Sequence, residues 1–463
     1  MLENLKSRLA ESVDFAALYG LLKAAPGGGL VHAPFALTPC PIDPAASRNL
    51  AELSLPFNRL AHAISGQIDF LAEALEEVVG ADPFTRDLLE MARNCASTQQ
   101  LYLQITRSDY FLQARQGLAA PVARQVELNT ISASYPALAA RVNLLHKHLL
   151  SDTPWEDALV ANDPLPDIVE GFAQAFRMYG HQDACVVMVV QAGEANVFDQ
   201  RMLEQALHAR HIPVVRLTLE AIAEQGSLRE GHLTIGGRIA AITYFRAGYT
   251  PDDFRSPEAM QGRKLVESSS TIPVPNLATH LAGTKKVQQL LTQPATLRRF
   301  CEEHDAALME ACFAGMYSLD EAVAGPGGPL AARKAAAVQP ERFVLKPQRE
   351  GGDNNLYDEE MVARLAALGP GEDRTFVLME RITPIPHDAV MVLEGKASAG
   401  KCLSEIGRFG VLLANGNEIL LNKDAGYLVR TKHHQVKEGG VSAGYGHLDS
   451  LIELPLEEAY RPV

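Results

Sequence analysis

The stretch FVLKPQREGGDNNLY, residues 343–357, carries the features that decide the fold. Its first three residues form a short apolar run that is typical of a buried strand. Lys346 follows directly and would place a positive charge for phosphate at the end of that strand. Gly351 and Gly352 allow a backbone to approach phosphates, and Glu350 offers the hard oxygen ligand that Mg²⁺ prefers. The stretch predicts a phosphate-binding loop that is neither a Walker loop nor a G-x-G-x-x-G fingerprint, the alternative being a charged surface turn.

A second motif, ELNTISAS, occupies residues 127–134. Glu127 and Asn129 alternate, so on a strand both side chains point to one face of a sheet. One carboxylate and one amide oxygen could together hold Mg²⁺. The Ser-Ala-Ser run that follows supplies hydroxyl and N–H groups for a carboxylate. The alternative interpretation is an edge strand followed by a turn.

A third motif is RTK at 430–432, followed by EGGVSAG at 438–444. Arg430 can hold a carboxylate through two hydrogen bonds, whereas Lys432 suits phosphate. The glycine-rich segment has the composition of a mobile flap that closes over a site. The alternative is a solvated loop.

Bulk properties exclude several classes of protein. The chain has 463 residues and 47% hydrophobic residues, which predicts two to four folding units. A net charge of −14 disfavours a sequence-independent nucleic-acid binder. The six cysteines show no zinc-like spacing, so we expect free thiols in a reducing compartment. With neither a signal peptide nor an apolar run long enough for a membrane span, we expect a cytoplasmic protein that binds no membrane.

Hydrophobic periodicity divides the chain into three parts. Residues 1–180 are expected to be mostly helical, and residues 181–290 to form a small parallel α/β unit in which strands and helices alternate. Residues 291–463 are expected to be helical to about 337, with a loop at 324–337, and strand-rich afterwards. Asn415-Gly416-Asn417 predicts a hairpin turn. The expected strands are Val186–Val190, Pro213–Leu217, Ile239–Phe245, Phe343–Leu345, Thr375–Met379, Ala389–Leu393, Cys402–Ile406, Val411–Ala414 and Ile419–Asn422, with a helix at Met202–Ala209.

Several strings, taken together and in order, resemble the eukaryotic-type glutathione synthetase family. They are ELNTISAS at 127–134, NVFDQ at 196–200, LAGTKKVQQ at 281–289, KPQREGGDNNLY at 346–357, MERI at 379–382, SEIGRFG at 404–410 and RTK with GGVSAG between 430 and 444. The resemblance implies an α/β (α+β) ATP-grasp fold with a largely helical N-terminal part. It places an inserted substrate-binding domain at 181–290 and the nucleotide-binding part at 291–463.

The resemblance also assigns roles to residues. It implies that Mg²⁺, as two ions, is held by Glu127, Asn129 and Glu350. The residues it implies for ATP are Lys285, Lys346, Gln348, Gly351, Gly352, Asn354, Asn355, Tyr357, Met379, Glu380, Arg381, Ile382, Glu405, Lys432 and Glu438. Those it implies for the substrates are Arg107, Ser132, Ala133, Ser134, Asn196, Gln200, Arg246, Tyr249, Arg430, Val441 and Ser442. The catalytic groups it implies are Arg107, Lys346 and Arg430.

The implied reaction joins γ-glutamylcysteine to glycine with ATP, through an acyl phosphate, in a homodimeric enzyme. Ser442 stands where members of the family that use glycine usually have alanine, which leaves serine or β-alanine open as the acceptor. Asp353 stands where the phosphate loop commonly has a third glycine, so the closed geometry of the loop is a further open point. An ATP-binding protein without ligase activity is a third hypothesis, which the presence of every expected lysine disfavours.

Overall fold

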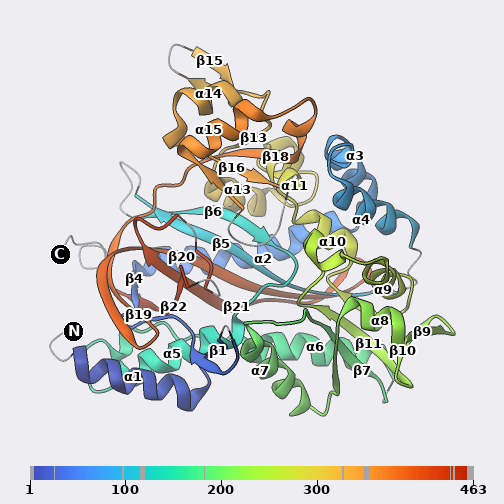
Figure 1. Cartoon of the computed structure of the whole chain (residues 1–463), viewed down its shortest axis with the longest axis horizontal. Coiled ribbons are helices and arrows are strands. Elements are labelled where there is room, and N and C mark those ends of the chain that lie inside the picture. The colour runs from blue at the N-terminus through green and yellow to red at the C-terminus, as the bar shows by residue number, and fades with distance from the viewer. Residues whose placement is uncertain are drawn as a thin grey trace.

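A large mixed sheet forms the centre of the molecule (Figure 1). The computed structural model describes residues 5–25, 27–95, 99–114, 120–181, 183–325, 328–348, 354–437, 439–441 and 444–455. The strands of this central sheet, in spatial order, are β19 (His387–Leu393), β3 (Phe35–Ala36), β22 (His447–Asp449), β21 (Glu418–His433), β20 (Lys396–Asn415), β5 (Leu101–Gln113) and β6 (Val122–Asn129). Gly416 and Asn417 form the tight turn between β20 and β21, with Gly416 at φ +57°, as the Asn-Gly pair predicts.

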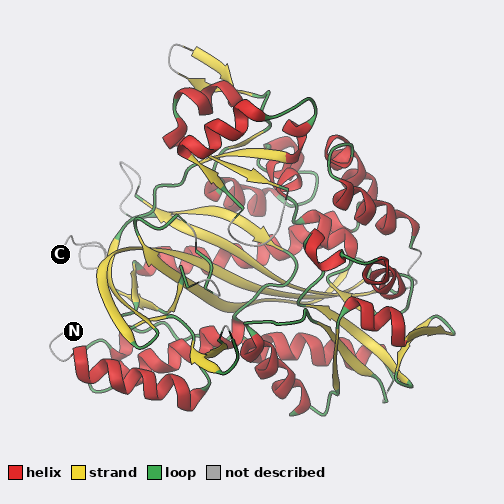
Figure 2. Ribbon diagram, viewed as in Figure 1, coloured by secondary structure: helices red, strands yellow, loops and turns green. Residues whose placement is uncertain are grey.

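Helices cover both faces of the central sheet (Figure 2). On one face α2 (Pro44–Ser65) packs against a core that includes Ile406, Tyr427 and Val429. The same core takes in α3 (Ile68–Val79), α4 (Pro83–Asn94), α10 (Leu277–Ala282) and α13 (Glu303–Cys312). On the other face α5 (Pro136–Leu150) and α6 (Leu165–Tyr179) cover Phe409, Val411 and their neighbours, and α1 (Leu5–Tyr19) packs on α5. The polar end of this second face is left for the site.

The inserted unit is a small sheet of its own. Its parallel strands are β8 (Val214–Leu217), β7 (Cys185–Val189), β11 (Arg238–Phe245) and β12 (Ile272–Val274), and the antiparallel pair β9 (Gly226–Arg229) and β10 (His232–Ile235) extends it. Its helices are α7 (Val197–His208), α8 (Leu219–Gln225) and α9 (Pro257–Glu267). Strand β7, which lies between β8 and β11, is buried along its whole length, which explains its continuous Val-rich run.

A small lobe stands over the central sheet, at the top of Figure 1. Its antiparallel sheet has the order β13 (Met316–Tyr317), β18 (Phe376–Glu380), β16 (Phe343–Pro347) and β17 (Leu356–Tyr357). The hairpin β14 (Ala322–Gly325) and β15 (Gly328–Ala331) and the helices α14 (Ala332–Val338) and α15 (Asp358–Ala367) complete it. Below it, α11 (Lys285–Leu291) and α12 (Pro294–Leu297) lead from the inserted unit toward the lobe.

The structure confirms the mixed helix-and-strand class and the predicted strands around 186–190, 213–217, 239–245, 343–345 and 375–379. The N-terminal part is largely helical, as expected, and it also contributes the long strand β5 to the central sheet. Two expectations were wrong. The segments Cys402–Ile406 and Val411–Ala414 are one strand, β20, because bulges rather than breaks interrupt its pairing. Within 324–337, Ala322–Gly325 and Gly328–Ala331 pair as a hairpin that runs into α14, where a loop was expected.

Two further predictions concern cysteines and membranes. All six cysteines are free thiols, as expected. Across the described ranges, no helix combines the length and the apolar character that a membrane crossing requires. The division into parts at residues 180 and 290 stays a prediction.

Candidate active site

The central sheet, the inserted unit and the small lobe meet at one cavity of about 650 Å³. Strands β5, β6, β20 and β21 of the central sheet form its floor. The loops after β7 and β11 close one end, at the carboxyl edge of the parallel strands, where ligands usually bind in such sheets. Strands β16, β17 and β18 of the small lobe close the other end.

Charged and amide side chains cover the floor, and we call them the floor cluster. Its members are Arg107, Asp109, Glu127, Asn129, Glu405 and Arg430. Strand pairing brings them together, because Arg107 lies opposite Asn129, Asp109 opposite Glu127 and Glu405 opposite Arg430. Residues directly opposite each other in antiparallel strands share a face, so residues distant in sequence become neighbours.

Arg430 is the cationic centre of the floor cluster. Its guanidinium donates to Asp109 Oδ2 at 3.1 Å and to the Glu405 carboxylate. Burial alone would lower the pKa of Arg430, but the carboxylates of Glu405, Asp109 and Glu127 raise it above its ordinary value. Burial raises the pKa of Glu405, against the opposing effect of Arg430. Arg430 is therefore a permanent cation that an incoming carboxylate could contact.

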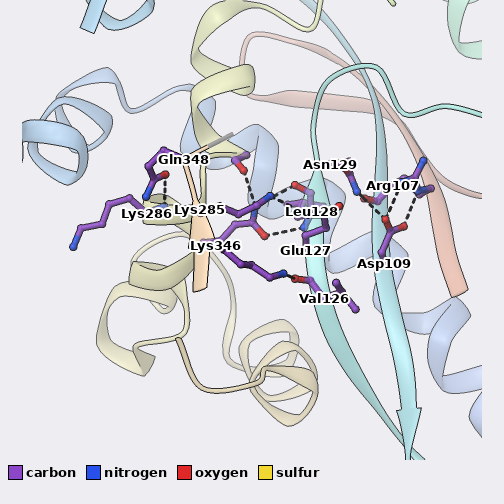
Figure 3. A network of polar contacts seen from close by, with 12 residues as sticks. Arg107, Asp109, Val126, Glu127, Leu128, Asn129, Lys285, Lys286, Lys346 and Gln348 are labelled. Carbon is purple, nitrogen blue, oxygen red and sulfur yellow. Dashed lines mark hydrogen bonds and ion pairs between the residues drawn. The ribbon is translucent and has the colours of Figure 1, made fainter. Parts of the chain in front are cut away.

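Glu127 joins the floor to two lysines from other elements (Figure 3). Lys285 at the start of α11 places Nζ 3.0 Å from Glu127 Oε2, and Lys346 at the end of β16 donates to the carbonyl of Val126 at 2.8 Å. Burial would raise the pKa of Glu127, but Lys285, Lys346 and Arg430 hold it well below its usual range. A carboxylate that stays ionised beside two lysines suits the binding of a polyphosphate and its counter-ion.

The inserted unit presents a second arginine. Arg246, at the end of β11, is 2% exposed; its Nη1 lies 3.1 Å from Asp199 Oδ2 and its Nη2 donates to Ser134 Oγ at 2.8 Å. The carbonyl of Ser134 accepts a hydrogen bond of 3.1 Å from Arg107 Nη1. The Ser132–Ser134 loop is thus held between two guanidinium groups.

Aromatic and basic residues line the small-lobe end. Tyr357 lies close to two cations, with Arg381 Cζ 5.6 Å and Lys437 Nζ 5.7 Å from its ring centre. Asp358, at φ +48°, pairs with both cations, at 3.0 Å to Arg381 Nη1 and 2.8 Å to Lys437 Nζ. These pairs link the segment after β21 to the lobe at the edge of the cavity.

The predicted magnesium site fits the residues that the structure describes. Asn129 Nδ2 donates to Arg107 O at 3.2 Å and to Asp109 Oδ2 at 3.0 Å, so its amide oxygen is the atom suited to a cation. An ionised carboxylate and an amide oxygen are hard ligands, which Mg²⁺ combines with phosphate oxygens. The third expected ligand, Glu350, lies outside the described residues. Within those residues, no group of three or more His, Cys, Asp or Glu side chains could hold a metal ion.

Most predicted residues face the one cavity. Those that line it are Arg107, Glu127, Asn129, Ser132, Ser134, Asn196, Arg246, Tyr249, Lys285, Lys346, Asn354, Asn355, Tyr357, Met379, Glu380, Arg381, Ile382, Glu405, Arg430, Lys432 and Val441. Three others lie behind the lining. Ala133 is in the core, Gln200 donates to Glu194 at 3.0 Å, and Gln348 accepts from the N–H of Lys286 at 3.0 Å. The predicted residues Gly351, Gly352, Glu438 and Ser442, and the variant position Asp353, lie outside the described residues.

Sequence reasoning missed three acidic residues that organise the site. Asp109 binds both arginines of the floor cluster, Asp199 binds Arg246, and Glu194 lines the cavity. Asp109 stands two residues after Arg107 on a strand, and alternation alone could have placed the two on one face. Asp199 and Glu194 are held by loop and helix geometry that no spacing rule predicts.

Comparisons with known proteins identify the family of this chain. Residues 4–452 match the family described as eukaryotic glutathione synthase, ATP binding domain. The glutathione synthetase of Homo sapiens is 39% identical over 430 residues, covering 90% of each chain, and that of Bos taurus is 38% identical over 464 residues, covering 97% of each. The chloroplastic glutathione synthetase of Solanum lycopersicum is 38% identical over 440 residues, covering 92% of this chain and 78% of that protein.

A solved structure shares the fold. It is the apo form of a glutathione synthetase-like effector from Globodera pallida, which superposes with a TM-score of 0.79 over 97% of both chains at 18% identity. A likeness at that identity concerns the fold alone. The family match over almost the whole length, together with relatives at 38–39% identity, shows that this chain belongs to the eukaryotic glutathione synthase family.

Proposed function

We propose that this protein is an ATP-dependent ligase that joins γ-glutamylcysteine to glycine and releases glutathione, ADP and phosphate. One observation carries the proposal. A single cavity brings the lysines Lys285 and Lys346 and the arginines Arg107 and Arg430 to the same floor cluster. Lysines suit the phosphates of ATP and arginines suit carboxylates, so the two reacting groups would meet there.

The reaction has two steps, since a carboxylate is a poor electrophile. The cysteinyl carboxylate first attacks the γ-phosphorus of ATP, an O–P bond forms and ADP leaves. The amine of glycine then attacks the acyl carbon, the C–N bond forms, the amine loses a proton and phosphate leaves. Charge on the transferring phosphoryl group and on the carbonyl oxygen must be stabilised in turn.

The described residues divide this work. Lys285 of α11, Lys346 of β16 and Lys432 of β21 neutralise the phosphates, and Tyr357 with Met379–Ile382 surrounds the nucleoside. Arg107 stabilises the developing oxyanion, and Arg430 holds a substrate carboxylate. Glu127 and Asn129 would hold Mg²⁺, which supplies charge neutralisation to the phosphoryl group when bound. The walls of the cavity limit hydrolysis of the acyl phosphate by excluding water.

The inserted unit would bind the γ-glutamyl end of the dipeptide. Arg246 and the Ser132–Ser134 loop can receive its α-carboxylate, and the Glu194 carboxylate at the same end of the cavity suits its ammonium group. A homodimer is an expectation that rests on the family, and a cytoplasmic location is one that rests on the sequence.

The test is ADP release and product analysis with ATP, Mg²⁺ and γ-glutamylcysteine, comparing glycine, serine and β-alanine as the acceptor. Fastest turnover with glycine, with glutathione as the product, is expected. Preference for serine or β-alanine would move the protein to a homologue-forming ligase and would make Ser442 the position to mutate. Binding of ATP without turnover on any of the three acceptors would refute the ligase.

A further inference from the structure

Asp109 is the residue of the floor cluster that contacts both of its arginines, Arg107 and Arg430. The side chain is only 1% exposed and lies on β5. Its carboxylate accepts from Arg107 at 2.6 Å (Nε to Oδ1) and 2.8 Å (Nη2 to Oδ2), and from Asn129 Nδ2 at 3.0 Å, as Figure 3 shows. It also accepts from Arg430 Nη2 at 3.1 Å. One buried carboxylate therefore contacts two arginines and a proposed metal ligand.

Gly407 on β20 makes room for this arrangement. It pairs directly with Asp109 across β5 and β20. A Cβ at position 407 would lie 2.7 Å from Arg107 Cδ and would overlap Asp109 Oδ1. The backbone of Gly407 lies outside the left-handed region, so glycine is required there for space and not for conformation.

We infer that Asp109, seated against Gly407, is the positioning residue that orients Arg107, Arg430 and Asn129 for the ligase reaction. Two guanidinium groups that converge on one cavity repel each other, and the carboxylate between them offsets that repulsion. Its two parallel hydrogen bonds to Arg107 also fix the plane of that guanidinium. Arg430 retains Glu405 as a second partner, so Arg107 depends on Asp109 more strongly. The inference rests on the proposed function, because it assigns Asp109 a role in that same reaction.

The first variant is Asp109→Asn, which keeps the shape of the side chain and removes its charge. The amide turns an N–H₂ group toward a guanidinium, so one of the two parallel hydrogen bonds is lost. Misplacing a reacting group by a fraction of an ångström to 1 Å costs up to about 100-fold in rate. We expect kcat/KM for γ-glutamylcysteine to fall about 100-fold, while the KM for ATP changes much less.

Asp424→Asn is the matched control. Asp424 pairs with Arg408, the residue after Gly407, and Arg408 Nε lies 3.1 Å from Asp424 Oδ1. Successive residues of a strand point to opposite faces, so this arginine–aspartate pair lies on the face of β20 away from the cavity. Both variants should lower the thermal midpoint by several degrees. Only Asp109→Asn should lower kcat/KM.

A second variant tests the space that Gly407 provides for these side chains. Gly407→Ala should disturb the same pair of side chains, so its loss of kcat/KM should be of the same order. The double variant Asp109→Asn with Gly407→Ala should lose far less than the product of the two single losses, because both act through one pair.

The outcomes separate the inference from the proposed function. An active wild type, with a selective loss in Asp109→Asn and a non-multiplicative double variant, supports the positioning role. Equal kcat/KM in Asp109→Asn and Asp424→Asn, or losses that multiply, would overturn it and leave the proposed function intact. A wild type that forms no glutathione would remove the proposed function, and the inference with it.

Discussion

The floor of the cavity and the small lobe above it are built in different ways. The floor rests on long strands, since β20 has 20 residues and β21 has 16, and its ion pairs are buried. In the small lobe, β13 and β17 have two residues each. The ion pairs of Asp358 there join side chains that are 35–51% exposed.

This difference teaches how one site serves two tasks. Orientation of a substrate carboxylate needs groups that do not move, and buried pairs on a continuous sheet provide that rigidity. A nucleotide must enter and leave, so an edge held by exposed pairs, each worth at most about 1 kcal/mol, opens at little cost. Glu127 lies on the floor and interacts with Lys346 of the small lobe. We therefore expect its substitution to reduce turnover more than any other.

The largest expected effect comes from that connection. Glu127→Gln removes the carboxylate that pairs with Lys285 and offsets the charge of Lys346, and it removes a proposed Mg²⁺ ligand. We expect kcat to fall by about 100- to 1,000-fold and the Mg²⁺ concentration for half-maximal rate to rise. Steady-state rates over a Mg²⁺ titration measure both. Glu77→Gln, which breaks the exposed 2.6 Å pair with Arg374, is the control and should keep the wild-type rate. An unchanged Mg²⁺ requirement in Glu127→Gln would remove its metal role.

An intermediate effect is expected behind the floor, at Asp449. Thr431 Oγ1 donates to this buried carboxyl at 2.6 Å and the N–H of Ser450 at 2.7 Å, and burial raises its pKa to about 8. The folded state therefore keeps a proton that the unfolded chain releases above its ordinary pKa of 3.8. As the pH rises from 3.8 to about 8, this group therefore lowers the free energy of unfolding, by up to about 1.4 kcal/mol per pH unit.

Asp449→Asn should remove this contribution. Urea unfolding of the wild type and the variant at several pH values from about 5 to about 7.5 gives the two slopes, and the variant should lose less stability as pH rises. Asp388→Asn, in an exposed 2.8 Å pair with Lys401 on neighbouring strands, should keep the wild-type slope. Parallel slopes for wild type and Asp449→Asn would show that the carboxyl is ionised in the folded protein.

The smallest effect is expected at the edge of the lobe. Asp358→Asn keeps a residue type that tolerates the positive φ at this position, and it removes the charge that pairs with Arg381 and Lys437. We expect the KM for ATP to rise about threefold at low salt and the difference to shrink as salt is added. Initial rates over an ATP titration at two salt concentrations test this. A loss of activity as large as that of Glu127→Gln would mean that the lobe is as rigid as the floor.

Local patterns predicted much of the fold and the site. The Val-rich strand at 186–190, the Asn-Gly turn at 415–417 and the alternation of Glu127 with Asn129 each depend on neighbouring residues alone, and the structure has them in place. Strand β5 was not predicted, because polar residues such as Arg107 and Asp109 interrupt its apolar pattern. They are buried there by pairing with strands that lie about 20 and 300 residues further along the chain.

By itself the sequence determined which side chains were available: the lysines, the arginines, the three metal-ligand candidates and the glycine-rich stretches. Those follow from residue type and short spacing, which the chain carries wherever it folds. Only the tertiary structure decided that Asp109 joins Arg107 to Arg430, and that Gly407 gives them room. Such contacts depend on the register between distant strands, and a one-residue shift of that register would turn every one of these side chains to the opposite face.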